Sequence, residues 1–357
     1  MSLIVDAHED IAWNMLCYGR DYTRSAHATR ALEAGQPHLK ETGSAMLGLP
    51  EWLQANVAVI FATLFVEPQR SPFISPRSMS YVTPDEAFGH AMKQMDHYRR
   101  LADQHRAFRV VYAQKDLDEV LAAWEGASQP QIGLVMLMEN ADPIRTPDEV
   151  ERWHAEGLRL IGPAWMGTRY CGGTGEPGPL TDDGARLLRH MQDLNMTLDL
   201  SHMAEQAFYQ SIDTYGGPLI ASHANPRAYV DGDRQLSDDM IRALVQRDGV
   251  IGSVPFNTFL VKDWSRKRGD PKDAAGIDHV VRAIDRVCQI AGDARHAGLG
   301  TDLDGGFGAE STPAGIDTVA DLPRIGDALR TAGFTPADVD AVMGGNWLRL
   351  LRQTLPD

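Results

Sequence analysis

Short apolar runs rich in β-branched residues alternate with longer amphipathic stretches along nearly the whole chain of 357 residues. This alternation is typical of parallel strands joined by crossover helices. Eight runs qualify as strands, and eight is the number that a closed barrel of parallel strands needs. We therefore predict an α/β fold, a (β/α)8 barrel of the TIM type with accessory helices and loops. The predicted strands cover residues 3–7, 57–64, 133–138, 158–162, 197–200, 219–221, 250–254 and 297–301.

Local signals mark the predicted helices. Thr83, Pro84 and two acidic residues open a long helical stretch, because proline and acids suit the first turn of a helix. Similar starts are predicted at Thr181, Ser237 and Thr335.

The remaining segments complete one domain. Segments 71–83 and 170–179 are rich in proline, serine and glycine, and we predict long loops there. A ninth apolar run, at 108–111, is interpreted as an accessory element. Neither an internal repeat nor a linker divides the sequence, so we predict a single barrel domain over residues 1–357.

Charge and cysteine usage limit the partners and the compartment. Lys plus Arg total 34 against 49 for Asp plus Glu, a net charge of −15, which repels nucleic acid and anionic membranes. The three cysteines are widely spaced and form no paired motif, as expected in a reducing compartment. The N-terminal residues do not resemble a signal peptide, and no apolar run reaches the ~20 residues of a membrane span. We expect a cytoplasmic protein.

The first predicted strand ends in a His-x-Asp pair formed by His8 and Asp10. In an extended segment these side chains project to the same side, because side chains alternate with period two. A nitrogen and a carboxylate oxygen together suit zinc. The same pair is also common as a structural feature, so both interpretations stay open on this motif alone.

Glu139 ends an apolar run that is otherwise typical of a buried strand. A carboxylate buried at a strand tip needs a cation or hydrogen-bond donors to offset its desolvation. The alternative is that the strand emerges into solvent at this point.

Two neighbouring predicted strands end in Ser-His, at His202 and His223. Because consecutive strands of a barrel are neighbours, the two imidazoles should converge. A single histidine at such a position is often structural, whereas a matched pair favours a shared ligand site.

Asp302 stands at the tip of the last predicted strand, before a glycine-rich turn that leaves room for a ligand. An Asx turn is the alternative interpretation, and Asp304 fits that role better. The carboxyl ends of barrel strands carry catalytic residues, so we expect these histidines and acids to form one site there.

In this order, the strand ends resemble those of the renal (membrane) dipeptidase family of zinc peptidases in the amidohydrolase superfamily. The resemblance is carried by VDAHED at 5–10, GTDLDG at 300–305 and GNWLR at 345–349. It extends over almost the whole chain and is close only at the strand ends. It implies a soluble bacterial-type member with two zinc ions per chain. His8 and Asp10 would hold one ion, His202 and His223 the other, and Glu139 would bridge them.

The resemblance also implies roles in catalysis and substrate binding. Asp302 matches an aspartate that handles the proton, and Arg234 lies where the family places an arginine that binds the terminal carboxylate of the substrate. An arginine fork suits that carboxylate. From the residues alone, Arg234 is equally interpretable as an ordinary surface arginine.

One departure concerns the substrate range. The family usually has a histidine after the fourth strand that steadies the oxyanion, and Trp165 occupies that position here. Arg169 and Tyr170 are candidates for a replacement donor at the substrate site.

The resemblance implies a binuclear zinc dipeptidase that hydrolyses short peptides, including L,D-dipeptides, by means of a metal-bridging hydroxide. Asp302 would carry the proton to the departing amine. A homodimer is likewise implied. Two alternatives stay open: a metal-dependent amidohydrolase for N-acyl amino acids or another small amide or lactone, and a metal-binding barrel without catalysis.

Overall fold

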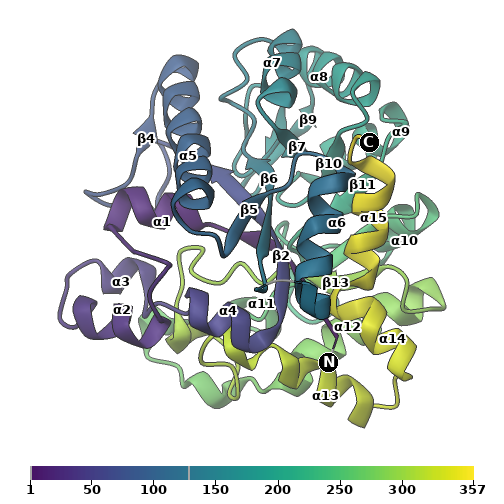
Figure 1. Cartoon of the computed structure of the whole chain (residues 1–357). Coiled ribbons are helices and arrows are strands. Elements are labelled where there is room, and N and C mark those ends of the chain that lie inside the picture. Colours follow the sequence, from purple (N-terminus) through teal and green to yellow (C-terminus); the bar gives the residue numbers. More distant parts are fainter. Residues whose placement is uncertain (1, 128) are drawn as a thin grey trace.

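The computed structural model describes residues 2–127 and 129–357, and its centre is a closed barrel of eight parallel strands (Figure 1). The strand order is β2-β1-β13-β12-β11-β10-β7-β6, and a pairing of β2 with β6 closes the ring. The prediction of a (β/α)8 barrel is confirmed. The barrel strands are β1 (Ile4–Glu9), β2 (Val57–Phe65), β6 (Ile132–Glu139), β7 (Leu158–Gly162), β10 (Thr197–Asp199), β11 (Leu219–Ala221), β12 (Val250–Ser253) and β13 (Ala297–Leu299).

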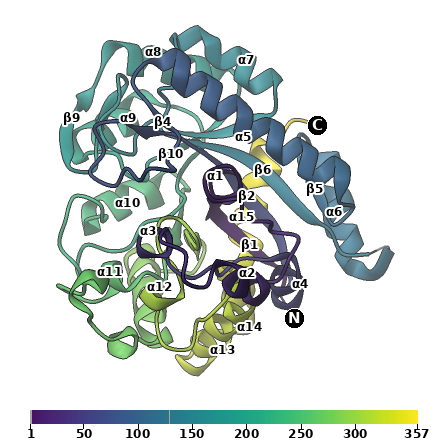
Figure 2. The same cartoon turned by 90° about the vertical axis from the view of Figure 1, so that its left-hand side faces the viewer.

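The ninth apolar run forms β5 (Phe108–Val110), which pairs with β6 beside the barrel. It is an accessory strand, as expected. Figure 2 shows α5 (Pro84–Gln104), the longest helix, alongside this edge of the molecule, where it packs on β2 and β5.

The helix starts follow the predicted capping residues. Thr83 caps α5, and its side chain and that of Glu86 form a reciprocal capping box. Thr181, Ser237 and Thr335 cap α8 (Asp182–Asp193), α10 (Asp238–Gln246) and α14 (Pro336–Asp340). The other α-helices are α1 (Ile11–Tyr18), α2 (Ala26–Glu33), α3 (Leu39–Thr42), α4 (Leu49–Ala55), α6 (Gln114–Ala122), α7 (Val150–Ala155), α9 (Glu205–Thr214), α11 (Asn257–Leu260), α12 (Ile277–Ala291), α13 (Pro323–Thr331) and α15 (Asn346–Thr354).

The two segments predicted as loops contain short strands. β3 (Glu67–Pro68) pairs with β4 (Ser80–Tyr81), so the first segment is irregular mainly between them. The prediction of a loop at 170–179 is wrong in part, because β8 (Cys171–Gly173) and β9 (Glu176–Leu180) form an antiparallel hairpin. Glycine permits this close pairing: a Cβ at Gly172 would lie 2.2 Å from the backbone nitrogen of Gly178.

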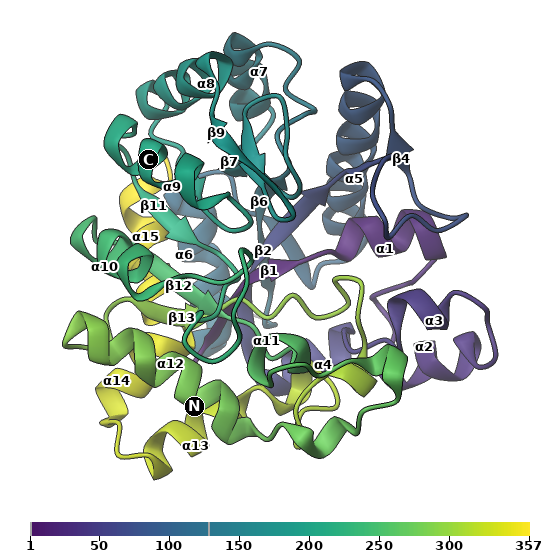
Figure 3. The same ribbon diagram turned by 180° about the vertical axis from the view of Figure 1, so that it is seen from behind.

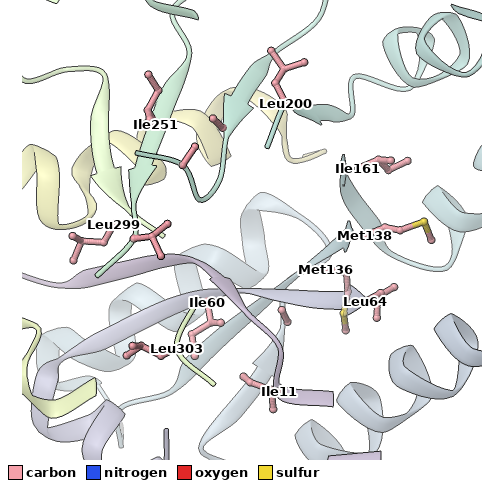
Figure 4. Close-up of a cluster of buried hydrophobic side chains, with 14 of the residues drawn as sticks. Ile11, Ile60, Leu64, Met136, Met138, Ile161, Leu200, Ile251, Leu299 and Leu303 are labelled. Carbon is pink, nitrogen blue, oxygen red and sulfur yellow. The ribbon is translucent and has the colours of Figure 1, made fainter. Parts of the chain in front are cut away.

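Two apolar cores hold the barrel together. The larger cluster joins the strands to the surrounding helices, and Figure 4 shows members such as Ile60, Leu64 and Met136. The alternate residues of the same strands, among them Phe61, belong to a second cluster that includes Trp347 of α15. This division follows from the two-residue period of a strand. Trp347 packs against β13 at Gly298. A Cβ at this glycine would lie 2.3 Å from Trp347 Nε1, so a larger residue would not leave room for the ring.

The helices lie outside the strands, which meet near the centre of the molecule (Figure 3). Within residues 2–127 and 129–357, no helix combines the length and the apolar character that crossing a membrane requires.

Candidate metal centre

All the predicted metal-binding and proton-handling residues lie at one rim of the barrel. His8 is in β1 and Asp10 follows it, Glu139 is the last residue of β6, and Asp302 follows β13. The two remaining histidines follow β10 and β11. Because the eight strands are parallel, their carboxyl ends meet at the same rim, which positions these side chains together.

Glu139 lies between the three histidines. Its Oε2 is 3.6 Å from His8 Nε2, whereas its Oε1 is 3.1 Å from His202 Nε2 and 3.2 Å from His223 Nε2. The two histidine nitrogens are themselves 3.1 Å apart. The structure therefore brings together four of the predicted residues, with one carboxylate oxygen directed at His8 and the other at the histidine pair.

Asp10 and Asp302 lie on the His8 side of this cluster. Asp10 Oδ1 is 3.9 Å from His8 Nε2, and ligand atoms of His8, Asp10 and Asp302 all lie within 4.8 Å of one another. The backbone N–H of Asp302 donates to the carbonyl of His8 at 3.0 Å. A Cβ at Gly305 would lie 1.9 Å from Asp302 Oδ1, so the glycine gives this carboxylate its space.

His202 and Asp302 both have left-handed backbone conformations, with φ of 63° and 56°. Non-glycine residues adopt this region at a cost of ~1 kcal/mol or more, and such residues cluster at functional sites. Both residues come directly after short strands, and the turn directs their side chains to the centre of the rim.

Asp304 has a structural role, but its carboxylate bonds residues far away in the sequence and not the nearby backbone that an Asx turn requires. Its side chain accepts hydrogen bonds from the Tyr22 hydroxyl at 3.0 Å and from the backbone N–H of Met46 at 2.8 Å. Arg20 Nη1 lies 3.2 Å from the same carboxylate. Asp304 thus ties the glycine-rich turn to the segment after α1.

A second set of residues, which the sequence did not identify, orients the histidine pair. The Thr174 hydroxyl lies 3.0 Å from His202 Nδ1, and the Ser222 hydroxyl lies 2.7 Å from His223 Nδ1. The Asp199 carboxylate accepts the backbone N–H of Ser222 at 2.9 Å. Partners of this kind fix the tautomer and ring direction of metal-binding histidines. The signal that could have identified Asp199 is a carboxylate inside the apolar run Leu-Asp-Leu at 198–200.

The electrostatics of the site are dominated by burial. Burial alone would lower the pKa of His8, but Glu139 and Asp10 raise it to about 10. Burial raises the pKa of Asp10 to about 7, while His8 acts in the opposite direction. Burial, reinforced by Arg234, lowers the pKa of His202 to about 4.

The acidic members differ from one another. Burial alone would raise the pKa of Glu139, but the charge on His8 and the closeness of the histidine pair hold it well below its usual value. Burial raises the pKa of Asp302 well above its usual value, and Asp10 and Glu139 add to this effect against His8. Buried carboxylates thus compete for positive charge, which a divalent cation supplies.

The residues fit a metal ion. His8 Nε2, Asp10 Oδ1 and Glu139 Oε1 are buried and make no hydrogen bond within the described part of the chain. Buried polar atoms normally have a partner, and these three face one another across the same small space. A donor set of imidazole nitrogens and carboxylate oxygens is typical of zinc.

Arg234 is placed beside the histidine pair. Its Nη2 donates to the carbonyl of His223 at 2.7 Å, and the guanidinium carbon lies 5.2 Å from the ring centroid of Phe259. Its Nε and Nη1 are buried and make no hydrogen bond to the described residues. Burial lowers the pKa of Arg234, with Asp302 and Glu139 acting against it. These N–H groups are thus available beside the predicted metal ligands.

The structure separates the three other predicted substrate-binding residues. The Trp165 ring lies 6.3 Å from that of His202. Arg169 and Tyr170 are directed elsewhere: the Tyr170 hydroxyl donates to the carbonyl of Ile144, and Arg169 donates to the carbonyl of Arg145. Of the three, only Trp165 is thereby brought to the histidine pair. The chain turns into the β8–β9 hairpin after Trp165, which is why the next residues face the segment at 144–145.

Comparisons with known proteins agree with this geometry. A family model described as membrane dipeptidase (peptidase family M19) matches residues 1–355. The chain is 34% identical over 213 residues to a Klebsiella pneumoniae protein called "Uncharacterized protein in pqqA 5'region", covering 57% of this chain and 75% of that protein. It is 25% identical over 367 residues to an uncharacterized dipeptidase of Schizosaccharomyces pombe, covering 98% and 80%.

Two solved structures of metallo peptidases superpose on nearly the whole chain. The crystal structure of dipeptidase AC, a metallo peptidase of family M19, superposes with a TM-score of 0.80 at 25% identity, covering 100% of this chain and 99% of that one. A metallo peptidase from Rhodobacter sphaeroides, liganded with a phosphinate mimic of the dipeptide L-Ala-D-Ala, gives a TM-score of 0.78 at 23% identity, covering 99% and 100%.

Proposed function

Since this chain belongs to the membrane dipeptidase family, peptidase family M19, and is a metal-dependent dipeptidase, we propose that it holds two zinc ions and hydrolyses dipeptides with a free C-terminal carboxylate. In this proposal His8 and Asp10 bind one ion, His202 and His223 bind the other, and Glu139 binds both.

The position of the Glu139 carboxylate carries the proposal. Its two oxygens face different histidine groups, one at 3.6 Å from His8 and the other at 3.1 and 3.2 Å from the histidine pair. A carboxylate that binds a single ion would need to face only one of these histidine groups, either His8 or the pair formed by His202 and His223. The arrangement supports a bridging role between two ions.

Zinc bound by these ligands would supply a hydroxide near neutral pH and would polarise the substrate carbonyl. The chain itself contributes the proton transfer. Asp302 lies within 4.8 Å of His8 and Asp10, and burial raises its pKa, so this carboxyl group retains a proton more readily than an exposed aspartate. A carboxyl group with a raised pKa suits general base and then general acid catalysis, in which the proton passes to the departing amine.

Arg234 would select the substrate by its terminal carboxylate. A carboxylate needs N–H donors that no other acceptor occupies, and Nε and Nη1 of Arg234 are buried and make no hydrogen bond to the described residues. Because Arg234 is fixed to the carbonyl of His223, the distance from the carboxylate to the metal ligands is also fixed. This arrangement favours dipeptides over longer peptides.

The proposal is tested with a substrate panel on zinc-loaded protein. The panel contains L,L-dipeptides, L,D-dipeptides, the same dipeptides with an amidated C-terminus, and N-acyl amino acids. L,D-dipeptides are included because the Rhodobacter sphaeroides structure contains a mimic of one. We expect turnover of free dipeptides and at least tenfold lower kcat/KM for the amides. Faster turnover of N-acyl amino acids than of every dipeptide would contradict the proposal.

Two further expectations are part of the proposal. The residues 1–357 form one domain, and the chain assembles as a homodimer. A single cooperative unfolding transition and a dimer mass in size-exclusion chromatography with light scattering are the expected results. Two separate transitions, or a monomer mass at all concentrations, would contradict them.

A further inference from the structure

Four aromatic side chains form a continuous surface beside the metal ligands. Trp13, Phe65 and Trp165 are linked by edge-to-face contacts, with ring centroids 4.9 Å apart in both pairs. Phe73 extends this row at 6.1 Å from Trp165. We call these four residues the aromatic wall. They come from α1, the end of β2, the segment after β7 and the segment between β3 and β4.

The aromatic wall runs from the interior to the solvent. Trp13 and Phe65 are buried, Trp165 is half-buried, and Phe73 is 66% exposed. Trp165 also contacts His202, at 6.3 Å between centroids, so the wall begins at a proposed metal ligand. The half-buried Trp165 and the exposed Phe73 leave apolar ring surface that a bound apolar group would remove from water.

The strand order places Trp13 and Phe65 opposite Arg234, whereas Trp165 follows β7, two strands from β11. Arg234 follows β11, which is four strands from β2 in either direction around the eight-stranded ring. Phe65 ends β2, and Trp13 belongs to α1, which follows the neighbouring strand β1. In Figure 3 α1 and β11 lie on opposite sides of the centre where the strands meet. The metal ligands therefore lie between Trp13 and Phe65 on one side and Arg234 on the other.

We propose that the aromatic wall binds the side chain of the N-terminal residue of the dipeptide and selects large apolar or aromatic side chains there. This inference rests on the proposed function and adds the substrate class. With the C-terminal carboxylate at Arg234 and the scissile amide at the metal ligands, the N-terminal residue is on the far side from Arg234. The wall offers it the apolar surface of Trp165 and Phe73.

The test compares kcat/KM within two series of dipeptides on zinc-loaded enzyme. Phe-Ala, Leu-Ala and Gly-Ala vary the N-terminal residue, whereas Ala-Phe, Ala-Leu and Ala-Gly vary the C-terminal one. We expect Phe-Ala and Leu-Ala to exceed Gly-Ala by about tenfold or more, as apolar pockets discriminate between side chains by such factors. The preference in the second series should be smaller.

Three variants assign the preference to the wall. Trp165→Ala should reduce the ratio of Phe-Ala to Gly-Ala by about fivefold or more, and Phe73→Ala should reduce it less because that ring is largely exposed. Tyr112→Ala, which removes a partly exposed ring beside Gly157 outside the wall, should leave the ratio unchanged. Because each ratio is measured within one preparation, losses of folded or metal-loaded enzyme cancel.

The results of the dipeptide series and the variants decide whether the aromatic wall binds the N-terminal side chain. Equal kcat/KM for Phe-Ala and Gly-Ala, an unchanged ratio in Trp165→Ala, or a larger preference in the C-terminal series would overturn it while leaving the dipeptidase proposal intact. Absence of turnover for all six dipeptides by zinc-loaded protein would overturn both.

Discussion

Replacing Glu139 by glutamine tests the bridging role with the least change in shape. Glutamine has nearly the same size, so the change removes the charge and keeps the volume of the side chain. Glu139 faces three histidine nitrogens at 3.1 to 3.6 Å in a buried position. Removing one partner of a buried charge interaction costs about 3 to 5 kcal/mol. Since 1.4 kcal/mol corresponds to a factor of ten, zinc affinity should fall about 100-fold or more.

The assay combines zinc titration against a competing chelator with kcat/KM on a free dipeptide. We expect Glu139→Gln to lose at least one zinc ion per chain at concentrations that saturate the natural protein, and to lose turnover about 1000-fold. Glu51→Gln is the matched control, because Glu51 is also buried but accepts a hydrogen bond from the backbone N–H of Ala26. It should keep both zinc ions and turnover. Retention of two tightly bound zinc ions and full activity by Glu139→Gln would refute the reasoning.

The remaining predictions concern protons, substrate and ligand orientation. In metal-free protein His8 has a pKa of about 10 and Asp10 has a pKa of about 7, so both side chains must lose protons to bind a cation. The affinity for zinc should therefore rise from pH 6 to pH 9, and zinc binding should release protons measurably in weak buffer. A pH-independent affinity would contradict this. Arg234→Met should lower kcat/KM for free dipeptides about 10- to 100-fold and abolish the discrimination against amidated dipeptides. Unchanged discrimination would argue against binding of the substrate carboxylate by Arg234. Thr174→Val should weaken zinc binding about 10- to 100-fold because it removes the hydroxyl partner of His202 Nδ1. Thr174→Ser keeps a hydroxyl and should retain the zinc affinity. Equal zinc affinities in the two variants would exclude a positioning role for Thr174.

The strands and the polar residues that follow them were predictable because both depend on short-range patterns. Apolar runs of three to eight residues mark the parallel strands, and the polar residues that follow these runs lie at the rim. The convergence of Glu139, His202 and His223 therefore follows from the sequence pattern and the parallel order of the strands. The capping residues Thr83 and Thr181 were predictable for a similar reason, since a cap depends on the next three residues.

The partner of His202 was not predictable because Thr174 comes from the β8–β9 hairpin, whereas the partner of His223 is the preceding residue, Ser222. Glycine at Gly172 and Gly178 looked like loop composition, but it serves the close pairing of two strands. That pairing brings Thr174 to His202. The same turn directs Arg169 and Tyr170 to backbone carbonyls at 145 and 144. Their positions depend on how the segment after Trp165 folds back, which local patterns do not encode.

Measuring zinc content and activity in the same samples tests whether Glu139 joins two ions in the active protein. Protein stripped by a chelator is titrated with zinc, and bound metal and dipeptide turnover are followed in the same samples. We predict no turnover without zinc, and full turnover only as the zinc content approaches two ions per chain. Full activity in rigorously metal-free protein, or a maximum at one ion with no further binding, would contradict a site in which Glu139 joins two ions.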